Sequence, residues 1–522
     1  MIITEILARN GRMFPDKTAL VERDPGNSSR RAITWRGFDH MANRIAQAFI
    51  KAGVQKGDRV AHLMMNSLEW LPVYFGILRA GALAVPLNFR FDADTLSMCV
   101  KCAGAKVMIF GEEFIERIEK VKPVLDESLH RYWFCGPLEA IPSWAEPFLE
   151  VISKEENRDP GIFMEITDDA ALYFTSGTTG APKGALLTHR NLEAACIVEN
   201  MHHRQTQEDI FLLIPPLYHT GAKMHWFGSF IMGGQGVILK GIRPKWILEA
   251  VSEERATVVW LLVPWALDIL LAIESGDVKL RNYHLDQWRL MHIGAQPVPS
   301  NLIQEWRRIF PHHQYDTNYG LTEATGPGCV HLGVENLHKI GAIGVPGFDW
   351  ECKIVNEQGA EVADGAPGEL AIKGPGVMKA YYGNPDATAE VLKGGWLHTG
   401  DVARRDGEGF IWLVDRKKDV IITGGENIFP FEIEDFLQGH PDIQDVAVIG
   451  LPSLRLGEIA TAIVQLKPGR ELASAEIDSY CQALPRYKRP RRIIFGTVPR
   501  NPTGKIEKPK LREKFGGRKE SL

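Results

Sequence analysis

A loop rich in glycine, serine and threonine is the first stretch of this sequence that could do chemistry. Residues 173–184 read YFTSGTTGAPKG, directly after an apolar run, which predicts a strand that leads into a loop. Glycines let a backbone approach a ligand, hydroxyl groups donate hydrogen bonds, and Lys183 adds a positive charge, so the stretch suits a polyphosphate. It is not a P-loop, because Pro182 and Gly184 stand where that motif needs Gly and Ser or Thr. A structural loop has the same composition, so other motifs must decide.

Further motifs with reactive or ligand-binding side chains follow along the chain. They read PPLYHTG (215–221), HIGAQPVP (292–299), NYGLTEAT (318–325), GWLHTGD (395–401), DRKKDVIITGGENIFPFEIE (415–434) and NPTGKI (501–506). Together with the glycine loop, they resemble the adenylate-forming superfamily, which includes acyl-CoA synthetases, firefly-type luciferases and the adenylation domains of peptide synthetases. The resemblance spans nearly the whole chain, and several motifs in the right order are far more specific than any one of them.

The resemblance implies a site for ATP and Mg²⁺. The residues that would hold the β- and γ-phosphates are Thr175, Ser176, Gly177, Thr178, Thr179 and Lys183. Those that would line the adenine and the α-phosphate are Gly294, Ala295, Gln296, Asn318, Tyr319, Gly320 and Thr322. Glu323 would hold Mg²⁺, an oxygen-seeking cation that bridges phosphates. Asp401 would accept from the ribose hydroxyls, with Arg416 as its companion, although an isolated Asp after Gly is most often a turn residue.

Lys505 in NPTGKI is the residue that the resemblance marks first for catalysis. Attack of a carboxylate on the α-phosphate builds negative charge on both partners, and a positioned ammonium group would stabilise that transition state. Without the flanking Pro-Thr-Gly, a lysine near a C-terminus is ordinarily a solvated charge. Thr322, Glu323 and His219 complete the expected catalytic set.

The resemblance also implies a second half-reaction after a domain rotation. The small C-terminal domain would turn about a hinge at Lys418 and exchange the Lys505 face for one that bears Gly424, Gly425 and Glu426, beside a channel for coenzyme A. The reaction expected is adenylation of a carboxylic acid with loss of pyrophosphate, then thioester formation with coenzyme A and release of AMP. An exposed linker charge is the alternative reading of Lys418.

The acid substrate is expected to be compact and apolar: aromatic, alicyclic or medium-chain. His219 resembles the residue between the acyl pocket and the coenzyme A channel, and the pocket would be lined by His219, Met224, Trp226, Phe227 and Trp260. Aromatic residues are also ordinary core. Three other activities stay open: loading of a separate carrier protein, a luciferase-like oxygenase, and a non-catalytic nucleotide-binding scaffold.

The elements that must position these residues alternate between helix-like and strand-like segments, which is typical of α/β units with mainly parallel strands. We expect an N-terminal adenylation domain over 1–415, made of α/β blocks at about 1–167 and 168–340 and a β-rich subdomain at about 341–415. A mobile α+β domain over 416–522 follows, with the hinge near 416–418. The longest apolar stretch, 258–273, contains Pro264 and Asp268 and predicts a buried strand followed by a helix.

Composition excludes several classes of protein. At 522 residues, 45% of them hydrophobic, the chain can bury several cores. Its formal charge of −5 gives no basic field for nucleic acid. Seven scattered cysteines make no disulfide framework, the opening residues resemble no signal peptide, and a cytoplasmic location fits best. Cys99 and Cys102 form a lone C-x-x-C, which we interpret as helix packing, and the basic run 486–492 is interpreted as solvated surface. A homo-oligomer is compatible with the sequence.

Overall fold

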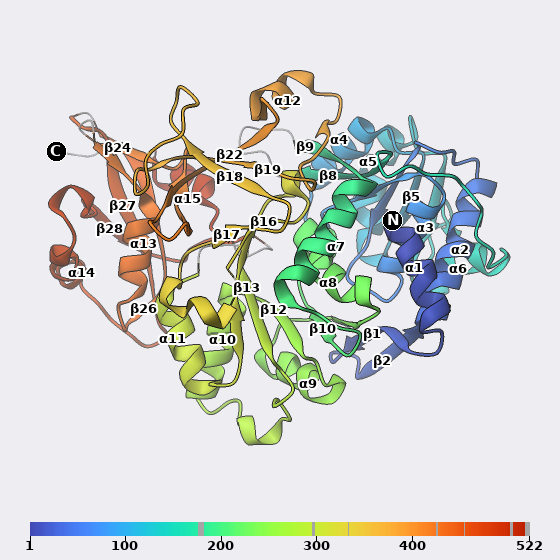
Figure 1. The fold of residues 1–522 in the computed structure, drawn as a ribbon, viewed down its shortest axis with the longest axis horizontal. Coiled ribbons are helices and arrows are strands. Elements are labelled where there is room, and N and C mark those ends of the chain that lie inside the picture. The colour runs from blue at the N-terminus through green and yellow to red at the C-terminus, as the bar shows by residue number, and fades with distance from the viewer. Residues whose placement is uncertain are drawn as a thin grey trace.

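The computed structural model describes residues 1–175, 182–294, 298–331, 333–423, 426–453, 455–501 and 505–516. It has a large N-terminal part built on two long sheets and a small C-terminal domain with a sheet of its own. Figure 1 shows the C-terminal sheet at one end of the molecule's longest axis and the first α/β sheet at the other. The expected α/β fold with a small α+β domain at its end is confirmed.

The first long sheet has eight strands and is parallel from β8 through β7. Its strands in spatial order are β20 (Ala380–Tyr381), β9 (Lys183–Thr188), β8 (Asp169–Thr175), β4 (Leu83–Pro86), β3 (Arg59–Leu63), β5 (Val107–Phe110), β6 (Arg131–Phe134) and β7 (Glu146–Pro147). β9 runs antiparallel to β8 and so returns the chain from the glycine loop into the sheet.

The second long sheet has seven strands, all parallel except β2. Its strands in order are β14 (Gln314–Asp316), β13 (Leu290–Gly294), β12 (Val258–Leu262), β10 (Ile210–Leu213), β11 (Gln235–Leu239), β1 (Thr18–Asp24) and β2 (Ser29–Thr34). Sheet membership does not follow the expected boundary at 167–168. β1 and β2 join the second sheet, and β8 and β9 join the first, because strand pairing is decided by long-range packing rather than by order along the chain.

Helices cover the sheets and fill the space between them. They are α1 (Ile3–Met13), α2 (Trp35–Lys51), α3 (Trp70–Arg79), α4 (Ala93–Ala103), α5 (Ile115–Leu125), α6 (Phe148–Ser153), α7 (His189–His203), α8 (Thr220–Met232), α9 (Pro244–Glu254), α10 (Val263–Glu274), α11 (Ser300–Ile309), α12 (Pro385–Val391), α13 (Pro430–Gln438), α14 (Ser474–Tyr480) and α15 (Lys508–Gly516). α7 and α8 lie at the centre of the molecule (Figure 1), and both are buried over most of their length. A helix with so little exposed surface has no solvated face, which fits its mixed pattern of apolar and polar residues.

The β-rich subdomain and the C-terminal domain complete the fold. The subdomain has β15 (Asn318–Gly320), β16 (Pro327–Val330) and β17 (Val345–Pro346) in one sheet, and β18 (Glu351–Val355), β19 (Gly368–Lys373), β22 (Trp396–Arg405), β21 (Leu392–Lys393) and β23 (Ile411–Arg416) in another. The C-terminal sheet has β25 (Glu426–Ile428), β24 (Ile421–Thr423), β27 (Gly457–Leu466), β26 (Ile443–Ser453) and β28 (Arg492–Phe495). Only residues 417–420 separate β23 from β24, so the two domains are joined where the hinge is expected.

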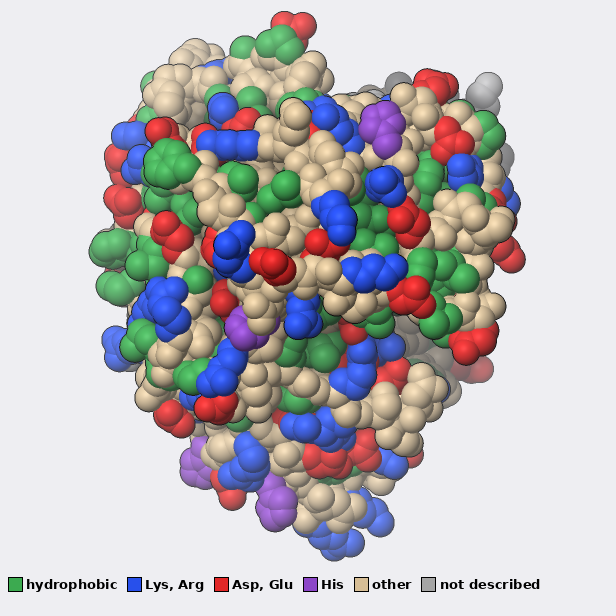
Figure 2. Space-filling view, turned by 90° about the vertical axis from the view of Figure 1, so that its right-hand side faces the viewer, with side chains coloured by type: hydrophobic (Ala, Val, Ile, Leu, Met, Phe, Trp, Pro, Cys, Tyr) green, Lys and Arg blue, Asp and Glu red, His purple; other side chains and the backbone are tan. Residues whose placement is uncertain are grey.

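Several smaller expectations can be compared with the structure. The apolar stretch 258–273 forms β12 and α10, as predicted. Cys99 and Cys102 lie on α4 as free thiols. Among the described helices, none combines the length and apolar character that a bilayer crossing requires. Figure 2 shows Lys and Arg side chains interspersed with Asp and Glu over one face, in keeping with the nearly balanced charge.

Candidate active site

Lys505 of the C-terminal domain lies within electrostatic range of charged residues from the N-terminal part. Its backbone N–H donates to Oδ1 of Asn501 at 2.9 Å, and a bridge between Arg500 and Ile506 closes the surrounding loop. The Lys505 residue as a whole is exposed, but the protein packed around its ammonium group removes part of that group's hydration. This loss of hydration, aided by the positive charge of Arg416, lowers the pKa of Lys505 to about 8.

Asp401 and Glu323 act on Lys505 in the opposite direction, since each carboxylate favours the charged ammonium. The site therefore brings together a lysine from one domain and two carboxylates from the other, although they are far apart in the sequence. An ammonium group with a pKa near neutrality in such a site is a candidate for a functional role.

Asp401 is buried and holds two partners. Its Oδ2 accepts from the hydroxyl group of Tyr319 at 2.6 Å, and its Oδ1 lies 3.2 Å from Nε of Arg416. Neighbouring strands β22 and β23 pair Asp401 with Arg416 directly, which explains the contact. The charge of Asp401 raises the pKa of Arg416, whose guanidinium group faces solvent. The expected ribose carboxylate and its arginine companion thus lie side by side.

Glu323 is held by Tyr381, a residue that the sequence analysis does not mark. The hydroxyl group of Tyr381 donates to Oε1 of Glu323 at 2.7 Å, and burial raises the pKa of the tyrosine, so it stays a donor. Nζ of Lys183 lies 5.2 Å from the centre of the Tyr381 ring, within the range of a cation–π contact. Tyr381 therefore joins the end of the glycine loop to the carboxylate expected to hold Mg²⁺.

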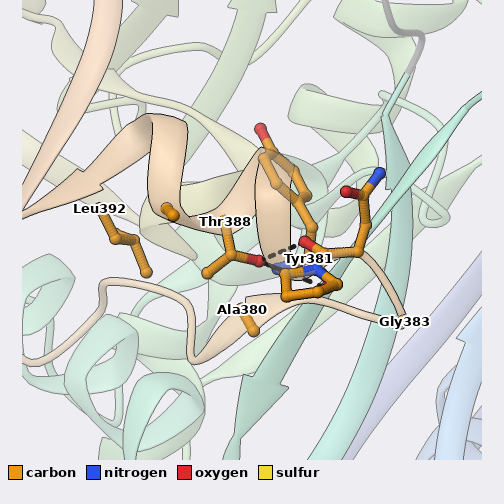
Figure 3. Close-up of a pocket in the computed structure, with 8 residues that line it drawn as sticks. Ala380, Tyr381, Gly383, Thr388 and Leu392 are labelled. Carbon is orange, nitrogen blue, oxygen red and sulfur yellow. Dashed lines mark hydrogen bonds between the residues drawn. The ribbon is translucent and has the colours of Figure 1, made fainter.

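The surroundings of Tyr381 keep it in place. β20 pairs with β9, so Tyr381 lies opposite Ala185, and its N–H donates to Oγ1 of Thr388 at 3.0 Å. Figure 3 shows this hydrogen bond beside a small, mainly apolar depression that includes Leu392. The backbone N–H of Met378 also donates to the carbonyl group of Glu323 at 2.7 Å.

The glycine loop is anchored at both ends by the β8–β9 pair. Thr175 lies opposite Lys183 in this pair, and its hydroxyl group donates to the Lys183 carbonyl at 3.3 Å. Eight of the expected site residues lie outside the described residues: Ser176, Gly177, Thr178, Thr179, Ala295, Gln296, Gly424 and Gly425. Glu426 begins β25 and is exposed, Lys418 is exposed, and Thr322 begins a short 3₁₀ turn that contains Glu323.

His219 and a buried lysine define the start of α8. His219 is the residue before the helix, and the loss of hydration lowers its pKa to about 3, with Lys505 acting in the same direction. Nζ of Lys223 donates to the carbonyl groups of Leu217 and His219 at 3.2 and 3.3 Å. Lys223 is wholly buried and its ammonium group lies 4.4 Å from the centre of the Tyr173 ring. Through these hydrogen bonds Lys223 connects the PPLYHTG segment to α8, next to Tyr173 of β8, the strand that leads into the glycine loop.

The aromatic residues expected around the acyl group divide into two sets. Met224, Trp226 and Phe227 are wholly buried in the main core, and Trp226 stacks on Trp35 of α2 with 6.4 Å between ring centres. Their pocket role stays a prediction. Trp260 of β12 lies instead beside the start of α8 and the end of β13. A Cβ atom added to Gly221 would lie 3.2 Å from Cη2 of Trp260. A Cβ atom added to Gly294 would lie 3.9 Å from Nε1 of the same ring.

Sequence reasoning therefore missed Tyr381 and Lys223. A Tyr-Tyr pair at 381–382 in a Gly-rich segment carries no signal of its own, because its partner Glu323 is distant in the chain. Lys223 did carry a signal, since a lysine next to Met224, Trp226 and Phe227 is unusual, and a buried lysine requires partners.

Comparisons with known proteins identify similar proteins over nearly the whole chain. The family model described as "AMP-binding enzyme" matches residues 7–382, and the model of the "AMP-binding enzyme C-terminal domain" matches residues 432–505. A feruloyl-CoA synthase from Amycolatopsis sp. is 34% identical over 512 residues, which cover 97% of this chain and 98% of that protein. The long-chain-fatty-acid–CoA ligase FadD13 of Mycobacterium tuberculosis is 31% identical over 516 residues, 98% of each chain.

A solved structure extends the similarity to three dimensions. The anthranilate CoA ligase AuaEII, in complex with anthranoyl-AMP, aligns with a TM-score of 0.90 at 25% identity. The alignment covers 98% of this chain and 97% of that one, so it includes both the N-terminal part and the C-terminal domain.

Proposed function

The chain belongs to the AMP-binding enzyme family and is an AMP-forming acid–CoA ligase that uses ATP and coenzyme A, and on this premise we propose that its acid is compact and mainly apolar. The observation that carries the proposal is the position of Trp260. Its indole ring lies between the first turn of α8 and the end of β13, against Gly221 and Gly294, and we infer that it limits the length of an acyl group bound there. Pockets of this kind select ligands by shape and apolar fit.

The acids named for the similar proteins are of two kinds. Feruloyl and anthranoyl groups are compact and aromatic, and the FadD13 ligase acts on long-chain fatty acids. We infer that this chain acts on an acid of the compact kind, which includes aromatic, alicyclic and medium-chain acids.

In the first half-reaction, we assign the central role to Lys505. The acid carboxylate attacks the α-phosphorus of ATP and pyrophosphate leaves, so negative charge grows between the two reactants. The Lys505 ammonium stabilises that charge, and Thr322 contacts the same phosphate. The proximity of Lys505 to Asp401 and Glu323 supports this assignment.

Glu323 is the residue that we propose as the Mg²⁺ ligand. Tyr381 occupies Oε1 as a donor and fixes the carboxylate, and no hydrogen bond to Oε2 appears among the described residues. A fixed carboxylate oxygen beside a phosphate site suits a hard cation such as Mg²⁺, which when bound neutralises phosphate charge. Asp401 and Arg416 would bind the ribose, and the loop that ends at Lys183 would hold the departing pyrophosphate.

The second half-reaction requires the C-terminal domain to turn. We propose that the short connection at 416–420 is the hinge, with Lys418 at its centre, and that rotation withdraws Lys505 and presents Glu426 with the neighbouring glycines to coenzyme A. The thiol then attacks the acyl carbon, the thioester forms, and AMP leaves. The N-terminal domain over 1–415 and the mobile domain over 416–522 would act as two bodies in this step.

The proposal is tested by pyrophosphate release across a panel of acids, each with and without coenzyme A. The panel contains short-, medium- and long-chain fatty acids, benzoate-type, cyclohexane-type and amino acids. We expect a compact acid to be preferred and its thioester to form only with coenzyme A. Preference for a long-chain acid would refute the compact pocket. Pyrophosphate release without a thioester would favour a carrier protein as acceptor, and a further assay with a holo carrier protein in place of coenzyme A then tests this. A cytoplasmic location, tested by cell fractionation, and a homo-oligomer, tested by light scattering, complete the proposal.

A further inference from the structure

A buried cluster of histidines and carboxylates lies against Trp260, and neither half-reaction as described above uses these histidines and carboxylates. Its members come from α7, α8 and strands β13 to β15: Glu199, His202, His203, His225, His292, Asp316 and Asn318. Glu199 and Asp316 are almost wholly inaccessible to solvent. Burying two carboxylates costs free energy unless both are fully paired. A pocket for wholly apolar acids would bind its substrate no better for having these two carboxylates nearby.

Glu199 orients the imidazole ring of His225. Oε1 of Glu199 lies 2.6 Å from Nδ1 of His225 and also accepts from Nδ2 of Asn318 at 3.0 Å. The proximity of His225 keeps the pKa of Glu199 below its ordinary value although burial opposes this, so the carboxylate is ionised. An ionised carboxylate only accepts hydrogen bonds, and Nδ1 must therefore be the donor. Nε2, on the other side of the His225 ring, takes no part in these contacts.

The Nε2 edge of His225 lies toward Gly221, at the start of α8. The His225 side chain keeps 8% exposure, whereas the Glu199 side chain that contacts its Nδ1 has none. Nε2 is 3.8 Å from the Cβ position at Gly221, the same glycine against which Trp260 packs. The two rings lie 4.3 Å apart between centres and meet at 65°.

Trp260 offers a second polar atom, at the Gly294 end of its indole ring. Its Nε1 is buried and has no hydrogen-bond partner among the described residues. Buried indole N–H groups usually have a partner, because an unpaired donor away from water costs free energy. Farther from Trp260, Asp316 lies 2.7 Å from His202 and 3.2 Å from His203. His292 fills the space between His203 and His225.

We propose that the acid carries a hydroxyl group at the end remote from its carboxylate, and that this hydroxyl forms a hydrogen bond with Nε2 of His225, next to the indole ring of Trp260. This inference rests on the compact-acid function proposed above. It narrows that class to hydroxylated acids, of which a ring with a para hydroxyl group is the simplest member. A site built to hydrogen-bond a substrate hydroxyl discriminates strongly against the analogue that lacks it.

The test compares matched acids in ATP–pyrophosphate exchange: benzoate with 4-hydroxybenzoate, and cinnamate with 4-hydroxycinnamate. We expect the full-length wild-type enzyme to prefer the hydroxylated member of at least one pair by about 10- to 100-fold in kcat/KM. His225→Asn keeps a donor close to the Nδ1 position for Glu199 but removes Nε2, and it should abolish this preference. Trp260→Phe should reduce it.

His202→Asn is the matched control, because it alters the same buried cluster farther from Trp260 and should keep the preference. Equal activation of both members of each pair by wild type would overturn the inference while leaving the compact-acid function intact. A preference that survives in His225→Asn would also overturn it. Activation of no compact acid would overturn both proposals. The wild-type comparison decides the matter even if a variant fails to fold.

Discussion

Replacement of Lys505 tests the catalytic assignment most directly. In Lys505→Ala the ammonium is lost, and the loss of one positioned electrostatic group typically costs about 10²- to 10³-fold in rate. ATP–pyrophosphate exchange, which reports the first half-reaction alone, should fall by this factor. Thioester formation from a pre-formed acyl-adenylate should fall far less, since Lys505 is expected to leave the site before that step.

The lowered pKa of Lys505 adds a prediction about pH. With a pKa of about 8, Lys505 is mostly protonated at neutral pH and mostly neutral one unit above its pKa. The charged fraction falls about tenfold between about pH 7 and about pH 9, and kcat/KM for adenylation should fall with it. A lysine with an ordinary pKa would remain charged over this range.

Lys505→Arg separates this effect from other titrating groups. A guanidinium group stays charged throughout the range, so the alkaline decline should disappear in this variant even if its rate is lower. The matched control is Lys510→Arg, because Lys510 is an exposed lysine of the same domain that pairs with Glu507. An alkaline decline that persists in Lys505→Arg, or exchange by Lys505→Ala at the wild-type rate, would refute the reasoning.

Three further predictions follow from contacts outside Lys505. Tyr381→Phe removes the 2.7 Å hydrogen bond to Glu323, so adenylation should fall by about 10-fold and need more Mg²⁺, as measured by a Mg²⁺ titration of exchange; an unchanged Mg²⁺ requirement would count against it. Arg79→Ala should lower the free energy of unfolding by about 3–5 kcal/mol in denaturant titration, because Arg79 is only 2% exposed and pairs with Asp39 at 2.9 Å; a loss below about 1 kcal/mol would contradict this. Burial raises the pKa of Asp415 to about 6 from an ordinary 3.8, so the stability that protonated Asp415 contributes is complete below pH 3.8 and is lost as the pH rises through about 6. Asp415→Asn should flatten this pH dependence of the melting temperature. A pH dependence that is unaltered in the variant would disprove the prediction.

The family motifs could be identified from the sequence because each is a local string with its own chemistry. The glycine loop, the HTGD turn and the NPTGKI segment carry their residue types at fixed short spacings, and their order along the chain indicates the superfamily. The same local patterns predicted β12 and α10 within 258–273, since strand and helix periods are properties of consecutive residues.

The sequence could not indicate which residues of α8 belong to the core. Apolar and polar residues alternate around this helix without a polar face, so its pattern does not separate pocket from core. Only packing against α2 and α7 decides that Trp226 lies in the core and that His225 turns toward Trp260.

Contacts between distant residues were decided by tertiary structure alone. Tyr381 reaches Glu323 because β20 pairs with β9, and Glu199 reaches His225 because α7 packs on α8. Each residue alone is an ordinary loop or helix residue. The sequence by itself thus determined the chemistry available to this protein, since residue types and local spacing are written in it. The tertiary structure decided which groups meet, because burial and pairing are properties of the packed chain.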